Sequence, residues 1–377
     1  MLRIAIVGCG KIADQHVEQI GFTPDCKIVS VCDREELMAQ QLRERLKLES
    51  HFIDLRELLD KVAPDVVHIT TPPQSHYGIG KLCLEAGCHV YIEKPFTVNA
   101  AEAEDLIALA NRKNLKLTVG HNAQFSHAAN DMRRLVEAGY LGGPPLHLES
   151  YFCYNLGDIS YAKTLLGDSA HWVRGLPGGL LQNIISHGIS KIAEFLDSDS
   201  PEVIAYGFTS PLLRSIGEID IIDELRVIIR GHDTTAYYTF SSQIRPVLHQ
   251  LRLYGSRNGL IVDDDQQTVI KVKGTPHKSY LEQFLTPAGY AKQYLRNSLG
   301  NMIKFLRADF QTDYGMRALI QSFYRSIVER APLPIPYDEI LRTSKIMDDI
   351  FAQLSSPVME RSQAIERAER QQRLLSL

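Results

Sequence analysis

The feature that most restricts the fold of this chain is a short apolar segment that runs directly into a glycine-rich turn. Leu2–Val7 is followed by Gly8-Cys9-Gly10-Lys11-Ile12-Ala13, and the residues after this turn favour a helix. Gly8 permits a tight turn, Gly10 lets the backbone approach a pyrophosphate, and Ala13 lets the helix lie close to the strand. The N–H groups at the start of that helix attract phosphate oxygens. The segment therefore predicts a strand, a dinucleotide-binding turn and a helix, in that order.

The alternation of strand and helix continues to about residue 120. Short β-branched runs predict strands, and the stretches between them carry apolar residues at helical spacing. We expect strands at 2–7, 27–32, 65–70, 88–92 and 115–119, and helices at 13–20, 76–86 and 100–113. Such alternation is typical of a parallel sheet covered by helices on both faces. The sequence predicts an α/β fold with a doubly wound, Rossmann-type domain at residues 1–122.

The second predicted strand ends at Asp33, where this fold needs an acid to accept hydrogen bonds from the ribose of adenosine. A carboxylate at that place repels a 2′-phosphate, which favours NAD over NADP. Arg34 follows and could stack on the adenine or pair with a 2′-phosphate, so NADP remains an alternative. Asp33 could also be an ordinary turn residue at a strand end.

Beyond residue 145 the chain changes to longer β-branched and aromatic runs separated by tight turns. Strands are expected at 146–154, 202–208, 219–229, 234–241, 248–254 and 269–272, with turns at 230–233 and 255–259. This pattern predicts a large, mainly antiparallel sheet in an α+β domain at 123–377. Helical stretches at 130–137, 183–195 and 316–330 are expected to cover one face of that sheet. Helices within 316–355 could instead pack back on the first domain.

Residues 282–310 form an amphipathic basic segment, most marked at 290–307, where apolar residues alternate with Lys292, Arg296, Lys304 and Arg307. The interpretation we favour is a helix packed on the second domain. A membrane surface or a neighbouring subunit is the alternative partner.

Composition excludes several classes of function. Lys and Arg number 41 against 45 Asp and Glu, a net charge of −4, which provides no positive field for nucleic acid. The six cysteines include no CxxC pair, and no Cys/His cluster has the spacing of a zinc site, so we expect reduced thiols and no metal. No signal peptide or integral membrane segment is expected, and a cytoplasmic location is predicted.

Two short motifs stand at the ends of later strands of the first domain. Thr71-Pro72-Pro73 with His76 follows the third strand expected, and Glu93-Lys94-Pro95 follows the next. Ligands of open parallel sheets bind outside the carboxyl ends of the strands, so that a lysine there points toward the nicotinamide.

With these motifs the chain resembles the Gfo/Idh/MocA oxidoreductases over nearly its whole length. The resemblance rests on the glycine-rich turn, on Thr71-Pro72-Pro73 with His76, and on Ala86–Pro95 with its Glu-Lys-Pro element. It extends to Val119-Gly120-His121-Asn122 with Phe125, and to Trp172 and Arg174 ahead of Asn183 and His187. It implies NAD or NADP as cofactor, a carbohydrate substrate, a Rossmann domain beside an α/β domain with a mainly antiparallel sheet, and a homodimer or homotetramer.

The resemblance also implies roles for individual residues. Lys94 and His187 correspond to the catalytic lysine and histidine, with His187 as proton acceptor and Lys94 stabilising alkoxide charge. His187 could otherwise be a structural histidine between helix and sheet. The expected cofactor-binding residues are Gly8, Gly10, Lys11, Ile12, Asp33, Arg34, Thr71, Pro72, His76, Glu93, Lys94 and Asn122. The expected substrate-binding residues are Lys94, Gln124, Trp172, Arg174, Asn183 and His187.

Three positions depart from the family pattern. Asn183 and Ser190 stand where the family usually has Asp, and Gln124 stands where Arg is common. Asn183 can orient a substrate or an imidazole but cannot stabilise an imidazolium by charge. Trp172 and Arg174 are expected either to form a substrate lid or, for the tryptophan, to pack at the domain junction.

Three functions are consistent with these residues. The leading one is hydride transfer between nicotinamide and a hydroxyl of a sugar, cyclitol or nucleotide-linked sugar. The second is an enzyme that retains its nicotinamide and performs elimination, epimerisation or glycoside cleavage. The third is a regulatory protein that binds a dinucleotide without catalysis. The presence of both Lys94 and His187 favours the first two.

Overall fold

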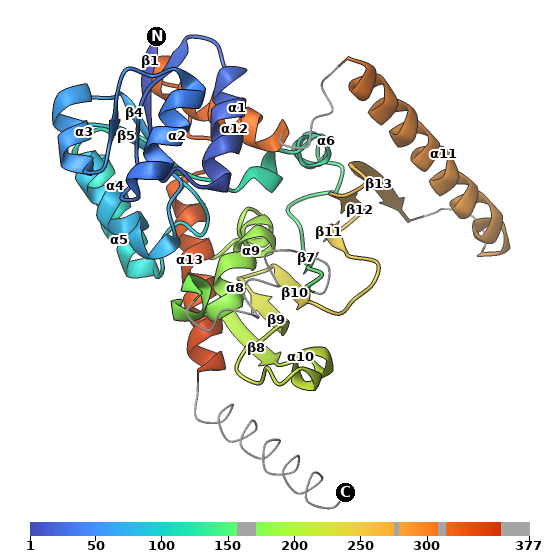
Figure 1. The fold of residues 1–377 in the computed structure, drawn as a ribbon. Helices are drawn as coiled ribbons and strands as arrows, with labels where there is room; N and C mark the ends of the chain where they lie inside the picture. The colour runs from blue at the N-terminus through green and yellow to red at the C-terminus, as the bar shows by residue number, and fades with distance from the viewer. Residues whose placement is uncertain (157–170, 275–278, 308–313, 356–377) are drawn as a thin grey trace, which may run out of the picture.

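The computed structural model describes residues 1–156, 171–274, 279–307 and 314–355. Two sheets organise these residues, and the two hydrophobic cores lie against them. Figure 1 shows the first sheet with its helices beside the second sheet, and one long helix extending away from both.

The first sheet is entirely parallel and has the strand order β3-β2-β1-β4-β5-β6. Its strands are β1 (Leu2–Val7), β2 (Cys26–Cys32), β3 (His51–Phe52), β4 (Val66–Ile69), β5 (His89–Ile92) and β6 (Leu117–Val119). The helices between them are α1 (Lys11–Gly21), α2 (Glu36–Leu46), α3 (Leu55–Val62), α4 (His76–Glu85) and α5 (Ala100–Arg112). The predicted doubly wound α/β arrangement is confirmed, and β3, α2 and α3 are additions to the elements expected.

The second sheet is mixed, with the order β13-β12-β11-β7-β10-β9-β8. Its strands are β7 (His147–Cys153), β8 (Glu202–Phe208), β9 (Glu224–Arg230), β10 (Thr235–Ser241), β11 (His249–Tyr254), β12 (Asn258–Asp263) and β13 (Thr268–Lys273). All neighbouring pairs are antiparallel except β7 with β10. The predicted mainly antiparallel sheet is therefore confirmed.

Several expected boundaries in this half were wrong. The strand expected at 219–229 begins only at Glu224, because the five residues before it connect α10 (Pro211–Ser215) to the sheet. The turn expected at 255–259 is shorter, since β12 already pairs with β11 from Gly259 onward. The helix expected at 183–195 is two helices, α8 (Gly179–Ile184) and α9 (Ser186–Ala193), with Ile185 between them.

Of the two C-terminal helices described, one packs on the first core and the other connects both cores. The expectation that 316–330 covers the second sheet was wrong, because α12 (Tyr314–Val328) packs on α1 and buries Leu319 and Phe323 in the first core. Helix α13 (Tyr337–Leu354) contacts both: Ile340 belongs to the first core and Ile350 to the second. Helix α13 therefore joins the two cores.

The remaining elements are α6 (His127–Glu137), α11 (Ser279–Leu306) and three short 3-10 turns, η1 (Pro73–Ser75), η2 (Asn122–Phe125) and η3 (Trp172–Gly175). Helix α6 lies on β12 and β13, and α11 lies on β13. Within the described ranges no helix combines the length and the hydropathy needed to cross a bilayer.

Candidate active site

The glycine-rich turn joins β1 to α1 and is shaped by close approach to β4. Gly8 has φ +98°, and a Cβ there would lie 2.8 Å from the backbone of Thr70 and Thr71, so only glycine fits. A Cβ on Gly10 would have no neighbour within 4 Å. A cavity of about 460 Å³ opens at this point between the turn and α2, lined by Gly10, Lys11 and Arg45 among others. Open backbone at a helix N-terminus fits a dinucleotide pyrophosphate.

Asp33 lies directly across this turn. One carboxylate oxygen accepts a hydrogen bond from Cys9 N–H at 2.7 Å, and the other accepts one from Glu35 N–H at 2.9 Å. Each oxygen keeps a second lone pair, so the carboxylate can still accept from a ribose hydroxyl. The Arg34 side chain is 89% exposed and has Glu35 at 3.7 Å. Contact of Arg34 with adenine stays a prediction.

The Thr71 loop is held against the loop that carries Lys94. His76 is fully buried, with Nε2 2.8 Å from the Thr71 carbonyl and Nδ1 2.9 Å from the Pro95 carbonyl. Thr71 Oγ1 accepts a hydrogen bond from Ser75 Oγ at 2.7 Å, and Pro72 precedes η1. In the structure His76 therefore positions two loops, and its contact with a cofactor stays a prediction.

Glu93 ends a buried chain of hydrogen bonds that the sequence did not indicate. Tyr324 OH lies 2.8 Å from His68 Nε2, His68 Nδ1 lies 2.8 Å from His16 Nδ1, and His16 Nε2 lies 3.0 Å from Glu93 Oε1. An ionised carboxylate only accepts, so that His16 Nε2 donates to Glu93, His68 donates to His16, and Tyr324 donates to His68. Every member is satisfied when both rings are neutral. Burial lowers the pKa of His68 well below its usual value, which agrees with a neutral ring.

The same carboxylate organises the neighbourhood of Lys94. Burial opposes ionisation of Glu93, but the hydrogen bond from His16 and the charge of Lys94 prevail, and its pKa is lowered. Glu93 Oε2 accepts the Lys94 N–H at 3.1 Å. Gly120 packs against this carboxylate so closely that a Cβ would lie 2.6 Å from Glu93 Oε1.

Lys94 reaches from the first domain to the second. Its Nζ donates to the carbonyl of Asn183 at 3.2 Å, near the C-terminal end of α8. Loss of hydration lowers the pKa of Lys94, and the Glu93 carboxylate opposes this effect. The Lys94-Pro95 peptide bond is cis. The lysine thus points out of β5 toward the helix pair that carries His187.

His187 lies near the start of α9, and its depth is determined by Gly188. A Cβ on Gly188 would lie 2.3 Å from the Tyr238 ring, so the glycine lets α9 lie close to the second sheet. The His187 ring stacks on Phe152, with centroids 5.0 Å apart. Burial lowers the pKa of His187 well below its usual value, and the charge of Lys94 acts in the same direction. His187 is therefore neutral and within electrostatic reach of Lys94.

His121 is a further member of this cluster that was not among the expected site residues. It is buried, and its Nδ1 has no hydrogen-bond partner within the described part of the chain. Burial lowers its pKa to about 4, while Glu93 opposes this change and Lys94 contributes to it. Because a buried polar atom normally has a hydrogen-bond partner, this unpaired nitrogen close to Lys94 marks His121 as a candidate member of the site. The sequence signal was the Val119-Gly120-His121-Asn122 motif at the end of β6.

Gln124 and Ser190 belong to a buried network behind the helix of His187. Gln124 Nε2 donates to Glu339 Oε1 at 2.6 Å and also contacts Glu194 Oε2 at 3.2 Å. Arg133 forms a bidentate ion pair with Glu194. Ser190 Oγ contacts the His187 carbonyl at 3.5 Å. These contacts give Gln124 a structural task, and its contact with substrate stays a prediction.

Asn122, Trp172 and Arg174, the remaining residues expected at the site, each contact other parts of the protein. Asn122 Oδ1 accepts from Tyr91 OH at 3.0 Å. The Trp172 carbonyl accepts from Gln74 Nε2 at 3.0 Å, which connects η3 to the Thr71 loop, and the indole packs against the second core. Arg174 forms an ion pair with Glu218 at 2.8 Å and lines a cavity of about 260 Å³. Their roles toward cofactor and substrate stay predictions.

Metal and redox-active thiol chemistry find no support in the resolved geometry. Within the ranges described, no three His, Cys, Asp or Glu side chains are grouped to hold a metal ion. All six cysteines are free, and burial raises the pKa of Cys9 and Cys32 to about 12. These thiols are protonated and packed in the core.

Comparisons with known proteins agree with the dinucleotide-binding fold of the first domain. Residues 2–121 match the family described as "Oxidoreductase family, NAD-binding Rossmann fold" (GFO_IDH_MocA). The D-glucoside 3-dehydrogenase of Escherichia coli (strain K12) is 34% identical over 142 residues, 37% of this chain and 40% of that protein. The myo-inositol 2-dehydrogenase of Thermotoga maritima is 23% identical over 75% of this chain and 83% of that protein.

A solved structure extends the likeness to the second domain. The WlbA dehydrogenase of Bordetella pertussis, in complex with NADH and UDP-GlcNAcA, superposes with a TM-score of 0.73 and 15% identity. The match covers 93% of this chain and 95% of that one, which shows a shared fold. The fingerprint turn, the Glu-Lys-Pro element and the family match identify residues 2–121 as an NAD-binding Rossmann domain of the Gfo/Idh/MocA oxidoreductase type.

Proposed function

We propose that this protein is an NAD-dependent dehydrogenase that oxidises a secondary hydroxyl of a sugar, cyclitol or nucleotide-linked sugar, or catalyses the reverse reduction. The observation that carries the proposal is the convergence of Lys94, from the end of β5, with neutral His187, from α9, beside the carboxyl edge of the first sheet. Domain 1–122 would hold the cofactor and domain 123–377 the substrate.

The chain's own residues would manage the proton and the negative charge. The nicotinamide, when bound, accepts the hydride from the carbon that carries the hydroxyl. His187 accepts the hydroxyl proton, which it can do because its lowered pKa keeps the ring neutral. Lys94 donates a hydrogen bond to the same oxygen and stabilises the alkoxide charge as the C–O bond becomes a carbonyl. The products are the ketone, the reduced cofactor and one proton held by His187.

The substrate class rests on the polar character of the site and on the relatives. Lys94, His121 and His187 offer one cation and two neutral rings, which suits a ligand with several hydroxyl groups. The relatives named above act, by their names, on a glucoside and an inositol, and the superposed dehydrogenase holds a nucleotide-linked sugar acid. Asn183 and Trp172 would border the bound sugar.

The test is turnover with pools of candidate substrates. Purified protein is mixed with NAD or NADP and with pooled glycosides, inositols, sugar acids or nucleotide-linked sugars, and reduced nicotinamide is followed by absorbance. We expect a rise with NAD. Lys94→Met should lower kcat by about 100-fold or more with NAD affinity unchanged, because its main loss is transition-state charge stabilisation. Lys61→Met, at an exposed Lys61–Glu57 pair on α3, is the control and should keep full activity.

Two results would overturn the proposal. If every pool fails while denatured protein releases NAD, the cofactor is retained and the chemistry is not net oxidation. If Lys94→Met turns over as fast as the parent protein, the assigned alkoxide stabilisation is wrong.

A further inference from the structure

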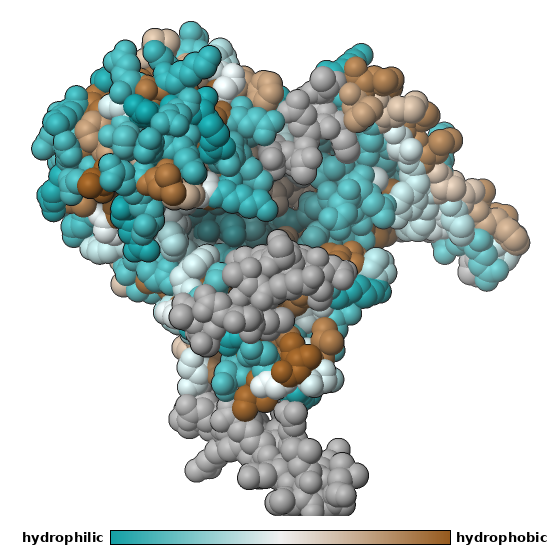
Figure 2. All heavy atoms as spheres, viewed as in Figure 1, coloured by the Kyte–Doolittle hydropathy of each residue, from teal (hydrophilic) through white to brown (hydrophobic). Residues whose placement is uncertain are grey.

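Helix α11 presents its apolar side to solvent. It is 28 residues long, contacts β13 at the edge of the second sheet and projects beyond the rest of the molecule (Figure 1). Large apolar side chains along it are 40–76% exposed, among them Phe284, Leu295, Met302 and Leu306. Figure 2 shows hydrophobic residues gathered along this projecting arm. A surface helix normally turns its apolar stripe toward the core, so this orientation is inverted.

The inversion has a clear local cause. The polar side of α11 pairs with the free edge of β13 through side-chain amides. Gln293 accepts from Lys271 N–H at 2.7 Å and donates to the Lys271 carbonyl at 3.1 Å. One helical turn later, Asn297 contacts the N–H and carbonyl of Val269 at 3.4 and 3.2 Å. These amides complete the hydrogen bonds of an edge strand, and they keep the opposite, apolar side of the helix facing outward.

The exposed surface is large enough for a stable interface. If each large apolar side chain exposes on the order of 100 Å², the helix shows roughly 1,000 Å² of apolar surface. The largest patch on a typical monomer is about 300–600 Å². A standard protein–protein interface buries about 800 Å² on each partner. The exposed apolar surface of the whole helix is therefore comparable with one side of a standard interface.

The spacing of the outward residues suits another helix. Phe284, Ala288, Ala291, Leu295 and Met302 follow one another at intervals of four, three, four and seven residues. This is the 3.5-residue repeat of helices that pack along their length. The two alanines are exposed and small, which allows a second helix to approach closely near the middle of α11.

The direction of the helix dipole favours an antiparallel second copy of α11. An antiparallel pair of 28-residue helices places the positive N-terminal end of each helix beside the negative C-terminal end of the other. A parallel pair would place ends of like sign side by side.

We propose that α11 pairs with α11 of a second copy of this chain, antiparallel across a two-fold axis, through the face that contains Phe284, Leu295 and Met302. Such a contact uses the same surface on both subunits, so that two subunits satisfy it and no further copy can add to it. It is independent of the dehydrogenase activity proposed above.

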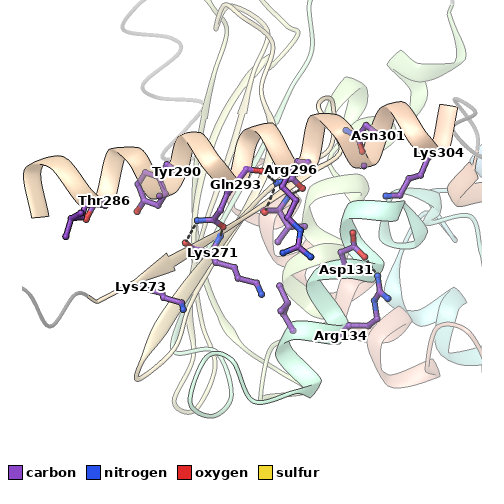
Figure 3. A pocket seen from close by; sticks show the side chains of 16 residues that line it. Asp131, Arg134, Lys271, Lys273, Thr286, Tyr290, Gln293, Arg296, Asn301 and Lys304 are labelled. Atoms are coloured by element: carbon purple, nitrogen blue, oxygen red, sulfur yellow. Dashed lines mark hydrogen bonds and ion pairs between the residues drawn. The ribbon is translucent and has the colours of Figure 1, made fainter. Parts of the chain in front are cut away.

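A lipid surface suits this helix less well. Binding to an anionic membrane needs cations that flank the apolar face. Arg296 and Lys304 instead line a groove of about 890 Å³ between α11, β13 and α6, together with Lys271 and Arg134 (Figure 3). They therefore lie on the side of the helix that faces the protein, in a chain of net charge −4.

The test is the mass of the full-length protein in solution, measured by light scattering and analytical ultracentrifugation. Leu295→Glu with Met302→Glu should weaken the association by about 100-fold or more, because it buries carboxylates at the centre of the contact. A dimer would become a monomer, and a tetramer a dimer. Leu37→Glu is the matched control, since Leu37 is 65% exposed on α2 and Leu295 is 63% exposed. Leu295→Gln with Met302→Gln repeats the test if the charged variant does not fold.

An unchanged mass in the folded double variants would overturn the proposal, as would a monomeric parent protein at micromolar concentration. Sedimentation with phosphatidylcholine–phosphatidylglycerol vesicles tests the alternative that this face binds a membrane. Vesicle binding that the double variant loses, with no change in mass, would assign the face to a membrane instead.

Discussion

His16, in the helix after the glycine-rich turn, contacts the carboxylate of Glu93 at 3.0 Å, and both side chains are almost completely buried. This contact connects the cofactor turn to the strand end that carries Lys94. It also closes the chain that starts at Tyr324 in α12. A C-terminal helix, the cofactor helix and the candidate catalytic lysine are thereby held in one hydrogen-bonded network.

Removal of His16 should destabilise the protein strongly. His16→Ala leaves a buried carboxylate without its side-chain donor, which typically costs about 3 kcal/mol or more. In Glu93→Gln the buried charge is absent, so adding His16→Ala to that variant should cost at least about 1 kcal/mol less than in the parent. Urea unfolding of the parent protein, the two single variants and the double variant measures this coupling. His51→Ala, on the edge strand β3, is the control and should show no coupling to Glu93→Gln. If the losses in free energy of unfolding caused by His16→Ala and Glu93→Gln simply add in the double variant, the network is contradicted.

The two glycines of the fingerprint should respond differently to the same substitution. Gly8→Ala should lower the free energy of unfolding by about 2 kcal/mol or more, because its φ is +98° and its Cβ would meet backbone atoms at 2.8 Å. Gly10→Ala should change it by no more than about 1 kcal/mol, since its Cβ enters open space. The dissociation constant of NAD should nevertheless rise at least about 10-fold in Gly10→Ala. Titration calorimetry with NAD measures this dissociation constant. If it is unchanged in Gly10→Ala, Gly10 is not part of the cofactor site.

The rate of substrate oxidation should be maintained at mildly acidic pH. His187 acts as a base only when neutral, and its pKa lies well below 6.5 because of burial and the charge of Lys94. The value of kcat/KM should therefore stay level as the pH falls to 6.5, and decrease only below it. A profile that already declines above pH 6.5 would contradict the assignment, provided His51→Ala retains the parent profile.

Glu339 should make the protein less stable as the pH rises. Burial raises its pKa from 4.5 to about 7, with Glu194 adding to the shift while Gln124 and two arginines oppose it. An acid with a raised folded-state pKa contributes stability that is complete below 4.5 and is lost as the pH rises through about 7. From pH 4.5 to 7, Glu339→Gln should gain up to about 3 kcal/mol relative to the parent protein. Denaturant unfolding across this range measures the gain, which exposed Glu329→Gln should not show.

Features built from neighbouring residues could be predicted from the sequence. The turn Gly8–Ala13 encodes its own conformation, and every strand of the first sheet except the two-residue β3 lies where β-branched runs predicted it. Parallel strands end at one edge, so the placement of Asp33, Thr71 and Lys94 at that edge also follows from local order. The physical reason is that contacts within a few residues determine these elements.

Contacts between distant residues were decided only by the tertiary structure. His16 meets Glu93 across 77 positions, Lys94 meets Asn183 across 89, and Gln124 meets Glu339 across 215. Helix α11 shows the same limit. Its amphipathic pattern indicated two faces, but pattern alone does not decide which face meets the protein. That choice depends on the unpaired edge of β13, whose N–H and carbonyl groups bind the amides of Gln293 and Asn297 and so turn the apolar face to solvent.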